Sequence, residues 1–403
     1  MQKRNPLLNL TGIFNKQTGF KMFFLSVLIS GLSYGLYKGM LDNFLAEVVQ
    51  MGEMDRGITE FFREIPGILL VFILAAFYML SAETMYKAGA VIMLAGMGMH
   101  AVLPPTKVLA TLAICIYSLG EHIQLGMKST LTLKYAKPGL GGTALGTQSA
   151  ISQIGTLVGY LVIVAAFSYF TENQPYSVFF VIAALLAGVS AVCAMRIKGK
   201  SDSRETKHRF YFRKKYKKYY MLEMFYGARK QVFLTFGPYV LILFYEANAA
   251  LISLLFAISA VACFFASPIV GKIIDKLGYK VVMVADTIIL VGVCMMYGFA
   301  HHIFPKDVAF VVCCVNYVLD AVISLASMAS NLYVQELSDN SDEVKATIST
   351  GVSINHVITI FIALFGGWIW KSLGIELLFI CSAVLGLLNS AYAFTIKPAR
   401  KKA

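Results

Sequence analysis

Twelve stretches of this 403-residue chain are each about as long and as apolar as a helix that crosses a bilayer. Such a helix needs about 20 predominantly apolar residues, and in lipid only helices or closed barrels satisfy their backbone hydrogen bonds. Barrel strands would alternate over about ten residues, whereas these stretches are unbroken. The sequence therefore predicts an all-α membrane protein with twelve transmembrane helices, at roughly 22–48, 60–80, 87–104, 108–133, 143–168, 176–197, 219–245, 247–271, 280–301, 308–334, 345–370 and 374–396.

The composition agrees with a bilayer as the solvent. Charged residues make up 14% of the chain, about half of what an average soluble domain carries. The seven cysteines all fall inside apolar stretches and show no metal-type spacing. No motif of a metal-dependent or serine hydrolase is present, so we expect no catalytic residues, no metal and no cofactor. The protein is predicted not to be an enzyme.

The distribution of lysine and arginine predicts the orientation. With the N-terminus in the cytoplasm, inner segments hold 26 of these residues, and the outer loops hold four: Arg56, Lys107, Lys306 and Lys371. Arg63 and Glu64, near the outer end of the second stretch, are expected to reach toward the interface. We therefore expect a multi-pass protein of the cell membrane with both termini cytoplasmic.

The segment between the sixth and seventh stretches is strongly basic, with eleven cations from Arg196 to Lys218, and its second half, from Lys207 on, interleaves cations with aromatics. Such a run suits the anionic lipids of the inner leaflet, whereas nucleic-acid binding is the less favoured alternative. The predicted organisation is a basic tail, a six-helix bundle, a polybasic loop, a second six-helix bundle and a basic tail, at residues 1–21, 22–197, 198–218, 219–396 and 397–403.

The two halves resemble each other at matched positions. Tyr34-Gly-Leu-Tyr-Lys38 in the first stretch and Tyr226-Gly-Ala-Arg-Lys230 in the seventh share the pattern Tyr-Gly-x-x-Lys at an offset of 192 residues. Tyr86-Lys87 matches Tyr279-Lys280 at almost the same offset. The chain thus reads as two parallel six-helix repeats, an architecture typical of transporters.

The segment after the eighth stretch, 271–280, reads Gly-Lys-Ile-Ile-Asp-Lys-Leu-Gly-Tyr-Lys. It resembles the cytoplasmic-loop signature of the major facilitator superfamily, and the twelve helices and basic central loop extend that resemblance over the chain. The corresponding segment after the second stretch, 81–87, lacks the glycines and the aspartate. The resemblance implies a role in conformational change for Gly271, Asp275, Lys276, Gly278 and Lys280.

Ionisable residues inside apolar stretches are costly and are functional candidates by default. Here they concentrate in the first, fourth, seventh and tenth stretches, which line the central cavity in the family that the chain resembles. Asp286, in the ninth stretch, lies outside this set and is expected to pair with the basic segment before it. The candidates for substrate binding are Tyr34, Lys38, Gln124, Lys128, Tyr226, Arg229, Lys230 and Asn316. Those for proton coupling are Asp42, Glu121, Glu223 and Asp320.

These residues predict a secondary transporter that works by alternating access and couples a small, anionic organic solute to protons. The cations Lys38, Arg229 and Lys230 suit a carboxylate or phosphate, while a buried carboxyl group can exchange a proton near neutrality. Internal ion pairs such as Lys38 with Asp42 remain an alternative for any single pair. A multidrug or lipophilic exporter and, less favoured, a non-transporting membrane sensor also remain open. We expect a monomer.

Overall fold

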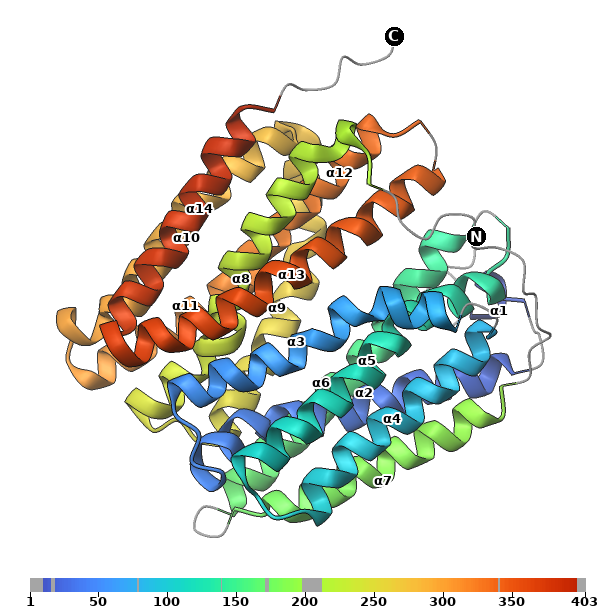
Figure 1. Ribbon diagram of the computed structural model, residues 1–403, viewed down its shortest axis with the longest axis horizontal. Coiled ribbons are helices and arrows are strands. Elements are labelled where there is room, and N and C mark those ends of the chain that lie inside the picture. Colours follow the sequence, from blue (N-terminus) through green and yellow to red (C-terminus); the bar gives the residue numbers. More distant parts are fainter. Residues whose placement is uncertain are drawn as a thin grey trace, which may run out of the picture. The chain divides into compact units, whose positions relative to one another are not determined.

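The computed structural model describes residues 10–15, 19–77, 80–138, 140–170, 174–197, 212–339 and 341–396. The described residues form long helices and no β-strand, and each predicted stretch corresponds to one long helical segment (Figure 1). These segments are α2 (Phe20–Asn43) continued by the π-helical turn Phe44–Val48, α3 (Glu53–Ala76), α4 (Ala82–Val102), α5 (Lys107–Tyr135), α6 (Gly141–Tyr169), α7 (Tyr176–Met195), α8 (Lys217–Tyr245), α9 (Ala249–Leu277), α10 (Tyr279–Ile303), α11 (Lys306–Ile323) continued through Ser324–Ser327 into α12 (Met328–Leu337), α13 (Ser341–Leu373) and α14 (Ile375–Phe394).

Ten of the helical segments are long and apolar enough to cross a membrane. The remaining two, α3 and α8, are long enough as well but carry several charged side chains. Because a helix satisfies its backbone hydrogen bonds internally, this architecture is the one that lipid permits. The prediction of an all-α membrane protein with twelve long helical segments is confirmed.

The start of the second helix differs from the prediction. The apolar stretch was expected from residue 60, whereas α3 begins at Glu53. The acidic residues Glu53 and Asp55 in its first turn suit the positive end of the helix dipole, and the Asp55 carboxylate accepts a hydrogen bond from the Gly52 backbone N–H at 3.1 Å. Arg56, which was assigned to an outer loop, is therefore a residue of α3.

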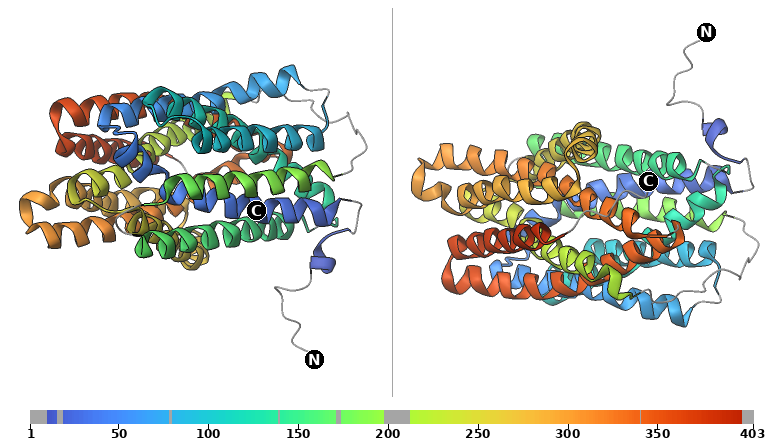
Figure 2. Two further views of the ribbon diagram at one scale, coloured as in Figure 1. Left: turned by 90° about the horizontal axis from the view of Figure 1, so that it is seen from below. Right: turned by 90° about the horizontal axis from the view of Figure 1, so that it is seen from above.

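The chain divides into two compact units. The first combines Met1–Leu41 with Leu69–Thr206, and the second combines Asp42–Ile68 with Lys207–Ala403. The second unit thus contains the end of the first helical segment and most of α3 together with the C-terminal helices. Within each unit most of the long helices lie along a similar axis (Figure 2). The division into two six-helix bundles at the central loop stays a prediction.

Close helix contacts hold the first unit together. Glycines on α2 and α6 let the two backbones approach, since a Cβ atom on Gly155 would lie 2.8 Å from the backbone nitrogen of Leu32. The α4 helix packs against α5 and α7. At the centre, Ser26 hydrogen-bonds Tyr86 of α4 and Ser190 of α7, at 3.1 and 3.0 Å. Small residues at helix interfaces are how membrane helices achieve such contacts.

In the second unit, α8 packs against α13 and α14, and α10 runs beside α14 (Figure 1). The N-terminal part of α3 is joined to α13 by another glycine contact, because a Cβ on Gly57 would lie 3.1 Å from the Cα of Gly367. Asn43, at the end of α2, donates a hydrogen bond to the Ala247 carbonyl at 2.7 Å. These contacts position α3 against the two helices that carry its polar partners.

Two glycines on α6 allow a matched test of this packing. We expect Gly155→Ala to lower the free energy of unfolding by about 1–3 kcal/mol, because the added methyl group meets the backbone of α2. Gly146→Ala, on the same helix with open space around it, should leave stability unchanged or raise it by up to about 1 kcal/mol. Thermal denaturation in detergent would measure both. Equal effects at the two positions would contradict the close approach of α2 and α6.

Candidate functional site

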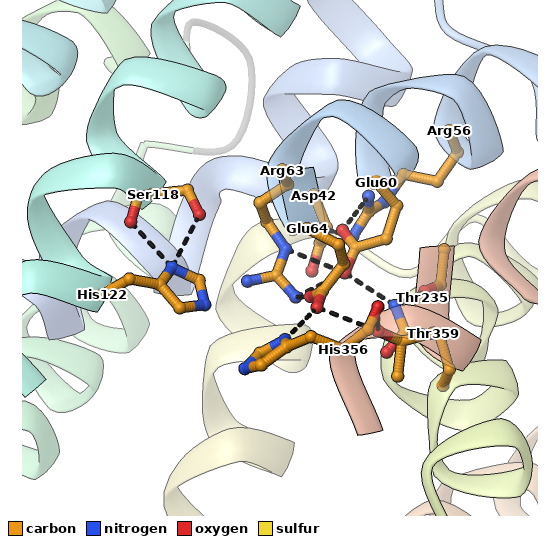
Figure 3. Close-up of polar contacts among 11 residues, drawn as sticks. Asp42, Arg56, Glu60, Arg63, Glu64, Ser118, His122, Thr235, His356 and Thr359 are labelled. Carbon is orange, nitrogen blue, oxygen red and sulfur yellow. Dashed lines mark hydrogen bonds and ion pairs between the residues drawn. The ribbon is translucent and has the colours of Figure 1, made fainter. Parts of the chain in front are cut away.

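The most highly charged face in the second unit belongs to α3. Arg56, Glu60, Arg63 and Glu64 follow one another at spacings of four, three and one residues, which places them on one side of the helix. Arg56 donates to Glu60 at 2.8 Å, Arg63 donates to Glu60 at 2.8 Å, and Arg63 also pairs with Glu64. Arg56 reaches Asp42 at 3.4 Å (Figure 3). We call these five residues the α3 network.

The α3 network is completed by neutral donors from α8 and α13. Gln231 Nε2 donates to Glu60 at 2.9 Å, and Thr359 Oγ1 donates to Glu64 at 3.0 Å. His356 Nδ1 lies 2.7 Å from the same Glu64 oxygen (Figure 3). Glu60 and Glu64 are only 1% and 3% exposed. Each buried carboxylate therefore has both an ionic and a neutral partner, as burial of a charge requires.

A second buried cluster joins α8 to α10. Arg229 Nη1 donates to Asp286 Oδ2 at 3.0 Å, and the Tyr226 hydroxyl donates to the same oxygen at 2.9 Å. The guanidinium also lies over the Tyr226 ring, 4.6 Å from its centroid. Thr287 adds a longer hydrogen bond to the other Asp286 oxygen, at 3.4 Å. Asp286 thus pairs with Arg229 rather than with the basic segment that precedes α10.

The remaining polar candidates of the second unit, Glu223, Asn316 and Asp320, lie on α8 and α11. Glu223 accepts a hydrogen bond from Ser330 at 2.8 Å, and Asn316 donates to the Val312 carbonyl of its own helix at 2.7 Å. The Asp320 side chain is buried, yet its carboxylate has no hydrogen bond or ion pair within the described part of the chain. Arg229 and Lys230 are near enough to Asp320 for an electrostatic interaction.

The first unit carries fewer charges. Glu121 accepts a hydrogen bond from Tyr117 at 3.4 Å, and Tyr34 lies close to Tyr117. Gln124 donates to the Tyr86 carbonyl at 3.4 Å, whereas its own side-chain oxygen is buried without a partner among the described residues. Lys38 is half-buried on α2. The Gln124 amide nitrogen thus joins α5 to α4, while the amide oxygen remains available as a hydrogen-bond acceptor.

His122 of α5 bonds within its own helix. Its Nδ1 lies 2.8 Å from the Ser118 carbonyl and 3.1 Å from the Ser118 hydroxyl (Figure 3). The ring is buried. Local bonding of this kind indicates a packing role for His122.

The membrane-embedded cations fall into two classes. Arg56, Arg63 and Arg229 are each paired with a carboxylate. By contrast, the ammonium groups of Lys128 on α5 and Lys230 on α8 make no hydrogen bond or ion pair with any residue that the structure describes. Glu121 lies within electrostatic range of Lys128, and Glu223 and Asp320 lie within range of Lys230. A cation without a contacting counter-charge in a membrane helix is a candidate for contact with an anionic ligand.

The expected loop after the eighth stretch is shorter than predicted. The α9 helix continues to Leu277, so Gly271, Asp275 and Lys276 lie in its last turns and only Gly278 separates it from α10. Gly278 has φ of +85°, a backbone conformation that favours glycine. Lys280 places its ammonium 4.6 Å from the centroid of the Phe394 ring. The motif therefore forms a sharp helix-to-helix turn.

Comparison with known sequences identifies the family. The sequence model of the Major Facilitator Superfamily matches residues 23–354 and 219–403. The chain belongs to this family. Membership makes it a membrane transporter rather than an enzyme, as predicted. No curated protein shows a significant match to the chain.

Solved structures share the fold. A crystal structure of the nucleoside transporter NupG is 16% identical to this chain, covers 94% of it and 99% of NupG, and has a TM-score of 0.73. A POT family transporter in complex with 5-aminolevulinic acid is 12% identical, with 94% and 96% of the two chains covered and a TM-score of 0.72. At these identities the likeness concerns the fold.

Sequence reasoning missed most of the α3 network. It placed Arg56 in a loop and treated Arg63 and Glu64 as interfacial side chains, and it did not single out Glu60 or His356. The spacing of Arg56, Glu60 and Glu64 at successive helical turns was the available signal, because it marks one charged face on an otherwise apolar helix.

The Arg229–Asp286 pair generates a stability prediction. We expect Asp286→Ala to lower the free energy of unfolding by about 3–5 kcal/mol, because it leaves the buried Arg229 guanidinium without a counter-charge. The double variant Arg229→Met/Asp286→Leu should recover much of that loss. Lys230→Ala, one residue away but exposed, should change stability by less than about 0.5 kcal/mol. SDS-induced unfolding would measure all three, and similar values for Asp286→Ala and Lys230→Ala would rule out the pair.

Proposed function

We propose that the protein is a proton-coupled secondary transporter of a small, anionic organic solute and works by alternating access. The observation that carries this proposal is the pair of lysines, Lys128 and Lys230, whose ammonium groups make no hydrogen bond or ion pair within the described residues. Carboxylates lie within electrostatic range but not in contact, Glu121 for Lys128 and Glu223 and Asp320 for Lys230. A substrate carboxylate or phosphate would supply a counter-charge in direct contact with the ammonium group. The paired arginines, in contrast, are already neutralised.

Lys38 and Tyr34 join this proposed binding set through the internal repeat, because they occupy the positions of Lys230 and Tyr226 in the other half of the sequence. Tyr226 and Arg229 contribute differently, since Asp286 holds both. We assign them the task of orienting α8 so that Lys230, the next residue, is presented on a different side of the helix. Gln124, with its unpartnered oxygen, and Asn316 are the neutral polar candidates.

For the proton we favour Asp320. Its carboxylate is buried without a hydrogen bond in the described structure, and Arg229 and Lys230 lie within electrostatic range. A buried carboxyl group prefers the protonated form, whereas a nearby cation favours the carboxylate, so the arrival of an anion beside Lys230 would promote protonation of Asp320. Glu121 and Glu223 each accept one side-chain hydrogen bond and are secondary candidates. Asp42, paired with Arg56, is the least suited.

The location and orientation follow from charge. We expect the protein in the cell membrane with both termini in the cytoplasm, because that orientation puts most lysines and arginines on the inside. The basic central loop would then lie against anionic inner-leaflet lipids. The competing proposal, export of lipophilic compounds, would need no unpaired lysine, so a test of the lysines distinguishes the two.

The substrate class can be tested first by binding. A thermal-shift screen of the purified protein against carboxylates, phosphates, nucleosides and lipophilic cations should yield anionic hits. For such a hit, Lys128→Ala and Lys230→Ala should each weaken binding about 30-fold, which corresponds to about 2 kcal/mol. Lys272→Ala, an exposed lysine on α9, is the matched control and should bind normally. Hits restricted to lipophilic cations, unaffected by the lysine substitutions, would support the exporter instead.

The coupling role of Asp320 has its own test in proteoliposomes. With the hit from the screen as substrate, we expect Asp320→Asn to abolish accumulation driven by a proton gradient while substrate exchange continues, because exchange needs no net proton movement. Asp307→Asn, on the same helix but exposed, should accumulate substrate as the parent protein does. Accumulation by Asp320→Asn that still follows the proton gradient would show that another group carries the proton.

A further inference from the structure

Two adjacent histidines and a glutamate converge where α10 ends and α14 begins. His301 and His302 lie in the last turn of α10, and Glu376 lies in the first turn of α14. The Nε2 atoms of His301 and His302 are 3.1 and 2.7 Å from the same oxygen, Glu376 Oε1. One ligand atom from each residue lies within 4.8 Å of the other two. Three potential metal-ligand atoms from two helices therefore lie close together.

The scaffold around these residues holds the two helix ends together. A Cβ on Gly298 would lie 3.0 Å from the Cβ of Phe379, and the Tyr297 and Phe379 rings pack with centroids 4.9 Å apart. A single residue, Gly374 with φ of +95°, joins α13 to α14. The other Glu376 oxygen lies 2.6 Å from where a Cβ of Gly374 would be, so this glycine gives the carboxylate its room.

We propose that His301, His302 and Glu376 bind a divalent transition-metal ion, with Zn²⁺ as the best match. Two imidazole nitrogens and one carboxylate oxygen form a ligand set that Zn²⁺ takes with water in its remaining position. The ion would replace the hydrogen atoms through which the His301 and His302 Nε2 atoms now hydrogen-bond to Glu376 Oε1. This proposal goes beyond the transport function and does not depend on it.

The electrostatics and exposure of the cluster suit such an ion. The last turn of α10 carries the negative end of that helix dipole, which favours a cation beside its final residues. The side chains of His301, Glu376 and His302 are 24%, 30% and 58% exposed, so an ion can reach them without unfolding. With the N-terminus in the cytoplasm, this end of α10 faces the outside. A bound ion would join α10 to α14 and thereby stabilise the fold.

The test uses the full-length protein, purified in detergent with an affinity tag that contains no histidine. Isothermal titration with ZnCl₂ should show one ion per chain, and the melting temperature should rise with Zn²⁺ because the ion binds the folded state. Titration with CoCl₂ should produce visible absorption bands from ligands bound to the metal. We expect His302→Ala and Glu376→Gln each to weaken Zn²⁺ binding by about tenfold or more.

Glu246→Gln is the matched control, since it removes another exposed carboxylate at a helix end, one paired with Lys306, and leaves the histidines intact. This variant should bind Zn²⁺ as the parent does. His301→Ala provides an independent second removal if Glu376→Gln folds poorly. The proposal fails if the parent shows no saturable binding up to millimolar Zn²⁺, or if the His301→Ala/His302→Ala variant binds the ion as tightly as the parent.

Discussion

The need to neutralise charge inside an apolar fold underlies the arrangement of this molecule. Glu60 lies between Arg56 and Arg63, and Arg229 lies between Asp286 and the Tyr226 ring. Of these side chains only Arg63 is appreciably exposed, and the others are buried. A single unpaired ion there would cost several kcal/mol, which exceeds what most individual packing contacts contribute. The α3 network therefore requires α8 and α13 to supply Gln231, Thr359 and His356, and the close glycine contact between α3 and α13 makes that approach possible.

This requirement distinguishes charges that contact a counter-charge from charges that do not. A charge that already contacts an opposite charge contributes to helix packing, as Arg229 does through Asp286, although its Nη2 atom has no hydrogen-bond partner among the described residues. A charge without a contacting counter-charge can still accept one from a ligand or, for a carboxylate, bind a proton. Lys128, Lys230 and Asp320 make no hydrogen bond or ion pair within the described residues, and our proposal assigns ligand and proton binding to them.

Hydropathy was sufficient to find every helical segment, because lipid requires each span to be long, apolar and helical. It was insufficient for the pairings, since Arg229 and Asp286 are 57 residues apart and Glu64 and His356 are 292 apart. Such contacts depend on which helices become neighbours, and that is decided by packing over the whole chain. The start of α3 was misplaced for a related reason: Arg56 looks like a loop residue until Asp42 and Glu60 neutralise it.

At one pair of positions that the sequence match makes equivalent, the two halves of the chain also make similar polar contacts. Tyr37 of α2 and Arg229 of α8 occupy equivalent places, each directly before the matched lysine. Tyr37 lies 3.2 Å from His100 of α4, and Arg229 bonds Asp286 of α10, so in both halves a buried polar residue joins the first helix of the repeat to the third. Successive residues of a helix point about 100° apart. A helix position that follows residue 37 or 229 is therefore on a different side of its helix from the contact with α4 or α10, and Tyr37 and Arg229 set this orientation with different chemistry.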